Sequence, residues 1–163
     1  MALVLVGGGA RSGKSRWALD RASKCGGRLV YIATAEALDE EMSRRIARHR
    51  AERGSAFQTI EEPLDLARAI RSAEGDAIVV DCLTLWLSNL MHASQERTGE
   101  TIAAATEKNA EVIVVTNEVG GGIVPENALA REFRDRAGMM NQRFADAAAE
   151  VYWMIFGQPL RVK

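Results

Sequence analysis

Cysteine, histidine and long apolar runs are scarce in this sequence of 163 residues. Cys25 and Cys82 form no Cys-x-x-Cys pair, and only two histidines are present to join them, so a zinc site and a disulfide framework are both unfavoured. The apolar stretch at residues 1–6 is far shorter than the roughly 20 residues of a membrane-spanning helix, and it lacks the pattern of a signal peptide. We expect a cytoplasmic protein without membrane insertion.

The sequence also has no excess of charge of one sign, with 21 basic and 22 acidic side chains. A nucleic-acid partner is therefore not expected, because binding along a phosphate backbone depends on surplus Lys and Arg. The basic set is nevertheless unusual, because it contains 17 Arg and only four Lys. Arg holds phosphate in a fixed two-pronged geometry, so this bias favours phosphate-bearing ligands.

The apolar residues that are present are arranged for an α/β fold in a single domain over residues 1–163. Short β-branched runs predict strands buried on both faces, and apolar residues every three or four positions predict amphipathic helices. The predicted strands are residues 3–6, 29–32, 77–80, 112–115 and 151–155; the predicted helices are 14–25, 39–53 and 100–109, one beginning near residue 83, and a long one opened by Pro125. This alternation predicts a mostly parallel sheet with helices on both faces.

A glycine-rich motif follows the first strand and opens the first helix. It fits the pattern Gly-x-x-x-x-Gly-Lys-Ser/Thr of a nucleotide phosphate loop, with the members Gly8, Gly9, Ala10, Arg11, Ser12, Gly13, Lys14 and Ser15. Its glycines let main-chain N–H groups close around phosphate oxygens, while Lys14 is expected to bridge the terminal phosphates and Ser15 to ligate Mg²⁺. The predicted fold is therefore a three-layer P-loop NTPase fold of the RecA-like type.

Asp81 follows the apolar strand at residues 77–80. In P-loop proteins an acid at the end of a neighbouring strand holds Mg²⁺, directly or through water, so Asp81 is predicted to complete the metal site with Ser15. The alternative is that Asp81 caps the helix that begins near Leu83.

His49 lies on a predicted helix that is rich in arginine and has Met42 and Ile46 on the same face. One interpretation makes His49 a histidine at the edge of the core, on a helix whose arginines are only solvated. The other makes it a nucleophile toward the α-phosphate of a nucleotide, because neutral imidazole attacks phosphorus well and nearby guanidinium groups balance phosphate charge. The second histidine, His92, follows a different helix and is assigned no role.

Together these motifs resemble one family over most of the chain, the bifunctional adenosylcobinamide kinase/adenosylcobinamide-phosphate guanylyltransferases of cobalamin biosynthesis. The resemblance rests on the phosphate loop and on residues 31–35, 45–50, 61–63, 81–89, 116–120, 122–125, 133–138 and 141–142. The phosphate loop alone is common to many kinases. The Arg-Ile-Ala-Arg-His-Arg helix, Asn-Glu-Val-Gly and Phe-Arg-Asp are specific.

The resemblance implies two reactions. First, the γ-phosphoryl group of ATP or GTP passes to the aminopropanol hydroxyl of adenosylcobinamide. Second, His49 takes GMP from GTP and expels pyrophosphate, and the phosphorylated cobinamide then attacks this covalent intermediate to give adenosylcobinamide-GDP. In this resemblance, His49 occupies the position of the family's guanylylated histidine.

The resemblance also implies nucleotide contacts outside the phosphate loop, at Ala33, Thr34, Ala35, Arg50, Ala51, Glu52, Arg53, Glu61 and Asp81. The residues alone allow other interpretations. Residues 33–35 fit a strand-to-helix turn equally well, and Glu61 fits a surface acid before Pro63. Asn117, at the end of a strand and before three glycines, is expected to line the corrinoid entrance, or else this segment only turns the chain.

The family pattern further implies a homotrimer in which the nucleophile helix lies near a neighbouring subunit. The sequence departs from the pattern where members commonly carry Arg-Pro and then Trp, because Gly54 follows Arg53 and Phe57 takes the place of Trp. The segment at residues 92–110 is also shorter than in several relatives. Both departures concern corrinoid positioning and subunit contacts.

Two other functions fit parts of the sequence. A small-metabolite kinase would use the phosphate loop alone, with His49 structural. A non-catalytic nucleotide switch would bind a partner protein, but the guanine-reading Asn-Lys-x-Asp motif of switch GTPases is absent, since residues 117–120 read Asn-Glu-Val-Gly.

Overall fold

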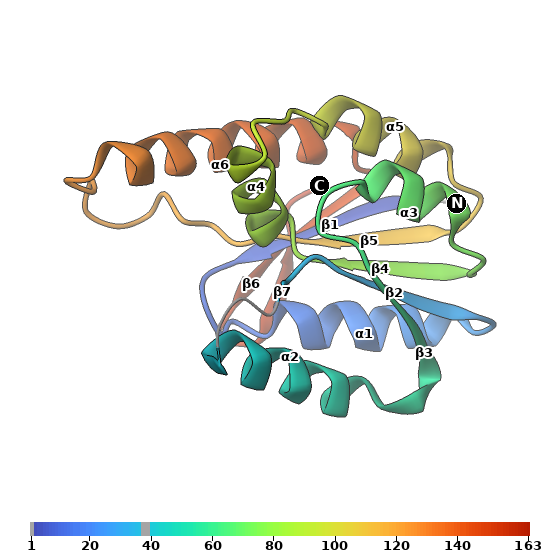
Figure 1. Ribbon diagram of the computed structural model, residues 1–163. Coiled ribbons are helices and arrows are strands. Elements are labelled where there is room, and N and C mark those ends of the chain that lie inside the picture. Colours follow the sequence, from blue (N-terminus) through green and yellow to red (C-terminus); the bar gives the residue numbers. More distant parts are fainter. Residues whose placement is uncertain (1, 37–39) are drawn as a thin grey trace.

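The structure is a computed structural model that describes residues 2–36 and 40–163, apart from the side chains of residues 41, 42, 45, 48, 49, 52 and 53. Within these residues the strands form one sheet in the order β3-β2-β4-β5-β1-β6-β7 (Figure 1). They are β1 (Leu3–Gly8), β2 (Leu29–Ala33), β3 (Phe57–Glu61), β4 (Ala77–Asp81), β5 (Glu111–Val115), β6 (Glu150–Ile155) and β7 (Gln158–Arg161). All pair in parallel except β7, which returns antiparallel beside β6.

Helices cover both faces of this sheet. In Figure 1, α1 (Lys14–Cys25) and α2 (Glu40–Arg53) lie below it, and α3 (Leu66–Ser72), α4 (Leu83–His92), α5 (Thr98–Glu107) and α6 (Ala128–Ala147) lie above it. The three-layer P-loop NTPase arrangement that the sequence predicts is therefore confirmed. Across the two described ranges, the helices include none with the length and apolar character to span a bilayer.

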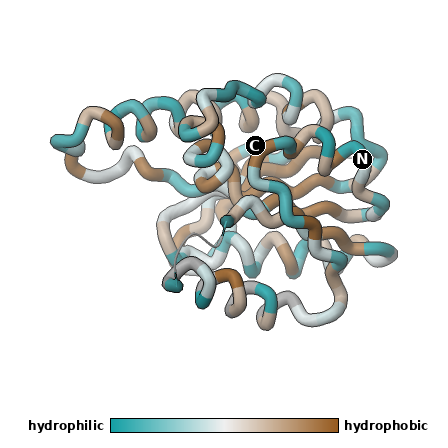
Figure 2. Tube along the Cα trace, in the orientation of Figure 1, coloured by the Kyte–Doolittle hydropathy of each residue, from teal (hydrophilic) through white to brown (hydrophobic). Residues whose placement is uncertain are grey.

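The alternation of side chains along β1 shows how the two layers of helices are held. Leu3 and Leu5 are buried in the core beneath α3, α4, α5 and α6, whereas Val4 and Val6 are buried against α1 on the opposite face. The central strands β1, β2, β4 and β5 are accordingly apolar over most of their length, and the middle of the sheet is brown in Figure 2. A strand that is buried on both faces consists of a continuous run of apolar residues, and this pattern allowed the sequence analysis to predict β1.

The register of the sheet places the ends of β3, β2, β4 and β5 in one row with Val6 of β1, which continues two residues further to Gly8. Glu61 pairs with Ala33, Ala33 with Asp81, Asp81 with Val115, and Val115 with Val6. Neighbouring strands lie about 4.8 Å apart, so Asp81 is about 10 Å from β1 across β5, and Glu61 is about 19 Å from β1. Because ligands of open parallel sheets bind outside the carboxyl ends of the strands, this row lines the candidate site.

Three sequence predictions require correction. The long helix begins at Ala128 rather than Pro125, because the Asn127 side chain accepts a hydrogen bond from the main-chain N–H of Ala130 and so caps it. The short helix predicted at residues 100–109 spans Thr98–Glu107. The strand that ends at Asp81 is not the direct neighbour of β1, because β5 lies between them.

Candidate nucleotide and metal site

The phosphate loop connects the end of β1 to the start of α1. Gly13 precedes the helix with a φ of 92°, in the left-handed region that favours glycine, and a side chain there would also meet the main chain of Gly157. No side chain caps the first turn of α1. The loop therefore directs the amino end of a helix, with its partial positive charge, toward the carboxyl edge of the sheet.

The ammonium group of Lys14 lies inside this loop. The Lys14 side chain is buried, and its Nζ donates hydrogen bonds to the main-chain oxygen of Gly9 at 2.5 Å and to Ser12 Oγ at 3.4 Å. A positive charge held among main-chain groups at a helix terminus provides a binding site for an anion of the size of a phosphate.

The turn between β6 and β7 supports the loop from the side, and the sequence did not reveal this contact. The main-chain N–H of Gly157 donates to Ser12 O at 3.1 Å. On the other side, the N–H of Glu118 donates to Gly8 O at 3.2 Å. Both contacts join segments more than 100 residues apart, so no local motif signals them.

Asp81 lies at the carboxyl end of β4 with its side chain half-buried. Its Oδ2 accepts a hydrogen bond of 3.0 Å from the Tyr31 hydroxyl of β2, which fixes the orientation of the carboxylate. The helix that follows is capped at Cys82 without a side-chain hydrogen bond, so Asp81 does not cap it.

The residues at this edge fit Mg²⁺ bound together with a nucleotide. Mg²⁺ prefers oxygen ligands and in phosphoryl-transfer sites is held by one or two protein groups, substrate phosphates and water. Ser15 in the first turn of α1 and Asp81 two strands away supply a hydroxyl and a carboxylate. Among the residues that the structure describes, no three His, Cys, Asp or Glu side chains gather into a metal site.

The segment after β2 is held to β4 by a closed set of hydrogen bonds. Thr34 is fully buried, and its Oγ1 both accepts from the N–H of Cys82 and donates to Cys82 O, each at 2.8 Å. Asn89 of α4 donates through Nδ2 to Thr34 O at 2.9 Å and to Pro63 O at 3.1 Å. Ala33, Thr34 and Ala35 therefore follow a rigid turn beside Asp81, and the Thr34 hydroxyl is used for structure.

A second set of hydrogen bonds fixes the end of β5. The main-chain N–H of Asn117 donates to Thr84 Oγ1 at 2.8 Å, and Asn117 Nδ2 to the same oxygen at 3.1 Å. Thr116 Oγ1 donates to Asn141 Oδ1 of α6 at 2.7 Å. The sequence analysis assigned a role to Asn117 but none to Thr116, which follows the strand between β1 and β4. Because Asn117 O also accepts from Asn141 Nδ2 at 3.3 Å, Asn117 joins α4 and α6 at the edge of the sheet.

The helix that carries His49 is tied to the same edge at one point. Arg50 forms an ion pair with Glu61 at the end of β3, and both side chains are exposed. Two residues predicted to contact the nucleotide are therefore brought together. His49, Glu52 and Arg53 belong to α2, but their side chains lie outside what the structure describes, and Ala51 is exposed on that helix.

At the opposite edge of the sheet, Arg21 joins α1 to β5 and β6. Its guanidinium donates to Glu111 Oε1 at 2.5 Å and to both Glu150 oxygens at 3.0 Å, and it lies over the rings of Trp17 and Tyr152. The hydrogen bonds from Arg21 and then from Tyr152 lower the pKa of Glu150 to about 2. This cluster holds the helix that begins with the phosphate loop.

The lowered pKa of Glu150 predicts a loss of stability in acid. A carboxylate whose pKa is lower in the folded chain stabilises it fully above its ordinary pKa near 4.5, and this contribution is lost as pH falls toward 2. We expect Glu150→Gln to reduce the free energy of unfolding by about 1 kcal/mol at pH 6, since the ion pair is partly exposed. Denaturant unfolding at pH 6 and pH 2.5 should show a smaller fall for Glu150→Gln than for the wild type. An equal fall would contradict the assignment.

Comparison with known proteins places the chain among enzymes of one kind. The family model described as cobinamide kinase / cobinamide phosphate guanyltransferase matches residues 4–162. The bifunctional adenosylcobalamin biosynthesis protein CobP of Pseudomonas aeruginosa is 46% identical over 166 residues, covering 98% of this chain and 96% of that protein. The bifunctional adenosylcobalamin biosynthesis protein CobU of Salmonella typhimurium is 41% identical, covering 99% of each.

Solved structures of low sequence identity share the fold. The flagellar accessory protein FlaH from Methanocaldococcus jannaschii superimposes with a TM-score of 0.56 at 13% identity, covering 99% of this chain and 78% of that one. The RadB recombinase has a TM-score of 0.50 at 17% identity, covering 93% of this chain and 73% of that one. These likenesses confirm the RecA-like fold.

Proposed function

Because the chain belongs to the family of cobinamide kinases / cobinamide phosphate guanyltransferases, we propose that it carries out both reactions at the carboxyl edge of the sheet. In the first, the aminopropanol hydroxyl of adenosylcobinamide attacks the γ-phosphorus of ATP or GTP and releases the nucleoside diphosphate. In the second, an imidazole nitrogen of His49 attacks the α-phosphorus of GTP and expels pyrophosphate. The phosphate of the corrinoid then displaces the imidazole, giving adenosylcobinamide-GDP. The observation that carries this proposal is the Lys14 ammonium held within the phosphate loop at 2.5 Å from Gly9 O.

For the phosphoryl transfer, the contribution of the chain is positioning and charge neutralisation. In our proposal the N–H groups of residues 8–15 and the Lys14 ammonium hold the β- and γ-phosphates against the amino end of α1. Ser15 and Asp81 hold Mg²⁺, which when bound neutralises charge on the phosphate oxygens. The rigid Ala33–Ala35 turn limits where the nucleotide lies on the Asp81 side.

For the guanylyl transfer, α2 must bring His49 to the α-phosphate. The Arg50–Glu61 ion pair supports an approach from the β3 side, because Arg50 is the next residue after His49 and Glu61 lies in the row of strand ends. In our proposal α2 brings His49 from this side to the α-phosphate for an in-line attack. Arg50 and Arg53 then balance the phosphate charge. Splitting the transfer lets the corrinoid phosphate replace imidazole after pyrophosphate has left.

Replacement of Asp81 tests the proposed metal site. We expect Asp81→Asn to raise the Mg²⁺ concentration needed for half-maximal activity about 10- to 100-fold, because the amide keeps the shape but loses the charge. The measurement is initial rate against Mg²⁺ concentration at saturating nucleotide. Tyr31→Phe, which keeps the ring but removes the hydroxyl that donates to Asp81, should have a much smaller effect. An unchanged Mg²⁺ dependence in Asp81→Asn would exclude Asp81 from the metal site.

We also infer a homotrimer from the family pattern. The segment between β5 and α6 supports association, because it exposes Ile123 almost completely and also exposes Val124. Light scattering should give three times the chain mass of 17.8 kDa.

The proposed function is tested by analysing the products. The protein is incubated with Mg²⁺, adenosylcobinamide and either ATP or GTP, and the corrinoids are separated by chromatography and identified by mass. ATP alone should give phosphorylated adenosylcobinamide, and GTP should carry the reaction on to adenosylcobinamide-GDP with release of pyrophosphate. If the phosphorylated corrinoid accumulates with GTP and no GDP derivative forms, only the kinase reaction remains.

A further inference from the structure

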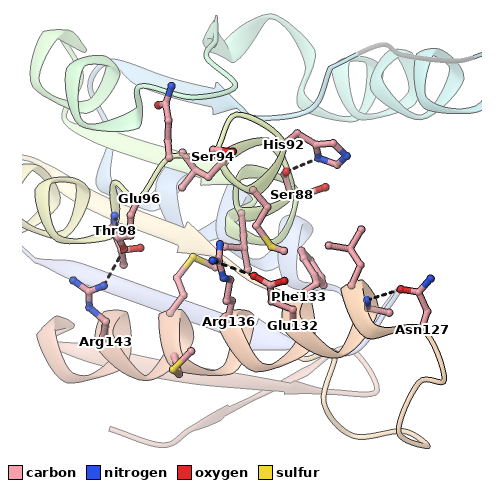
Figure 3. A pocket seen from close by; sticks show the side chains of 18 residues that line it. Ser88, His92, Ser94, Glu96, Thr98, Asn127, Glu132, Phe133, Arg136 and Arg143 are labelled. Atoms are coloured by element: carbon pink, nitrogen blue, oxygen red, sulfur yellow. Dashed lines mark hydrogen bonds and ion pairs between the residues drawn. The ribbon is translucent and has the colours of Figure 1, made fainter.

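A large hollow lies outside the nucleotide site, between α4, the segment that follows it and α6 (Figure 3). Its volume is about 1150 Å³. Small-molecule sites commonly have volumes of about 300–1,000 Å³, so this hollow suits a ligand larger than a nucleotide. In Figure 3, Ser88 and His92 of α4 face Glu132 and Phe133 of α6 across it.

The floor of the hollow is apolar. Leu87, Leu90 and Met140 are buried there, and Met91 and Phe133 are half-buried beside them. Methionine and aromatic side chains of this kind adapt to a broad, flat apolar surface. A ligand that covers this floor must therefore have an extended apolar face.

The rim of the hollow is polar but has no charge excess. Arg143 forms an ion pair with Glu96 at 3.1 Å, and Arg136 with Glu132 at 3.1 Å. These four residues are the acidic residues and arginines among the lining residues that the structure describes, so each arginine of the rim is paired with a glutamate. Free phosphate or a nucleotide would need an unpaired cation. The rim instead suits a ligand edged with amides, which donate and accept hydrogen bonds.

The hollow lies next to the proposed site of phosphoryl transfer. α4 begins two residues after Asp81, and Leu87 is four residues into that helix, a rise of about 6 Å. Between them, Thr84 is hydrogen-bonded to Asn117 at the carboxyl edge. A ligand in the hollow therefore has one end about one helical turn from that edge.

The geometry points to this hollow as the binding site for the corrin ring of the acceptor, with the aminopropanol arm directed past Asn117 to the phosphate loop. This assignment rests on the function proposed above. The corrin ring is broad, has a delocalised charge and carries amide side chains at its edge, which matches the apolar floor and the neutral polar rim. The flexible arm that ends in the hydroxyl suits the step of about one helical turn from the hollow to the carboxyl edge.

Filling the hollow tests this assignment. Ala130 of α6 lines it and is half-buried, and its hydrogen bond to Asn127 uses only the main chain, so Ala130→Trp adds bulk without removing a contact. We expect the KM for adenosylcobinamide to rise at least about tenfold and the KM for the nucleotide to stay within about twofold. Ala147→Trp makes the same exchange at an exposed position of α6 outside the lining, so it is the matched control and should leave both values unchanged.

Hydrogen exchange of the wild-type protein gives a second measurement that does not depend on a variant. Adenosylcobinamide alone, without nucleotide, should slow exchange at residues 87–98 and 127–143. Two results would overturn the assignment if the wild type phosphorylates the corrinoid: an unchanged KM for adenosylcobinamide in Ala130→Trp, or protection only outside these residues. The proposed function would then remain intact. Protection elsewhere together with a lower molecular mass of Ala130→Trp would overturn it as well, because the hollow would then be a contact between copies. A wild type that phosphorylates no corrinoid would instead refute the proposed function.

Discussion

Replacing Lys14 by Met should abolish both activities, lowering kcat for phosphoryl and guanylyl transfer by about 1,000-fold each. The substitution keeps most of the side-chain volume but removes the ammonium that lies 2.5 Å from Gly9 O inside the loop. In the proposed mechanism both reactions place their triphosphate in this loop, so both should lose charge stabilisation. The measurement is the steady-state rate of each product at saturating nucleotide.

The matched control for this prediction lies on the same helix. Lys24 is exposed in the last turn of α1, where Lys24→Met removes the same charge far from the loop, and it should leave both rates within about twofold. Circular dichroism and thermal unfolding should confirm that both variants are folded. Retention of either activity within tenfold in folded Lys14→Met would contradict a single shared phosphate loop.

The second large effect is expected at His49, and it should separate the two reactions. His49→Ala removes the proposed nucleophile, so formation of adenosylcobinamide-GDP should fall below about one thousandth of the wild-type rate. Phosphorylation of adenosylcobinamide should stay within about threefold, because that step uses the loop and the metal site alone. The phosphorylated corrinoid should therefore accumulate.

Each outcome at His49 distinguishes a different role. Equal losses of both activities, with a normal fold, would indicate that His49 supports the site structurally. Full retention of guanylyl transfer would show direct attack of the corrinoid phosphate on GTP, without a histidine intermediate.

The parts of the fold that the sequence predicted are those determined locally. The phosphate loop needs glycines and Lys14 at fixed spacing, and β1, β2, β4, β5 and β6 are continuous apolar runs because helices cover both faces. The sequence analysis missed β3, because its Gln58 and Thr59 are exposed at the sheet edge, and β7, whose residues are all exposed and which depends on pairing with β6. It also missed α3, which is only seven residues long.

The candidate site was predicted as a set of residues but not as an arrangement. No sequence pattern shows that the Thr34 hydroxyl is used to hold Cys82, or that Arg50 pairs with Glu61. These contacts join segments that are distant in the chain and follow from the strand order. That order also explains why β5 separates Asp81 from β1, which the motif alone did not indicate.

The most direct test of the central proposal is covalent labelling of the protein by GTP. The protein with Mg²⁺ and GTP labelled at the α-phosphorus should acquire one acid-labile, alkali-stable label per chain at His49, and GTP labelled at the γ-phosphorus should leave none. His92→Ala should keep the label, since His92 lines the hollow above the sheet and this reaction needs no corrinoid. Label that withstands acid, or that persists in His49→Ala, would contradict the guanylyl-histidine mechanism.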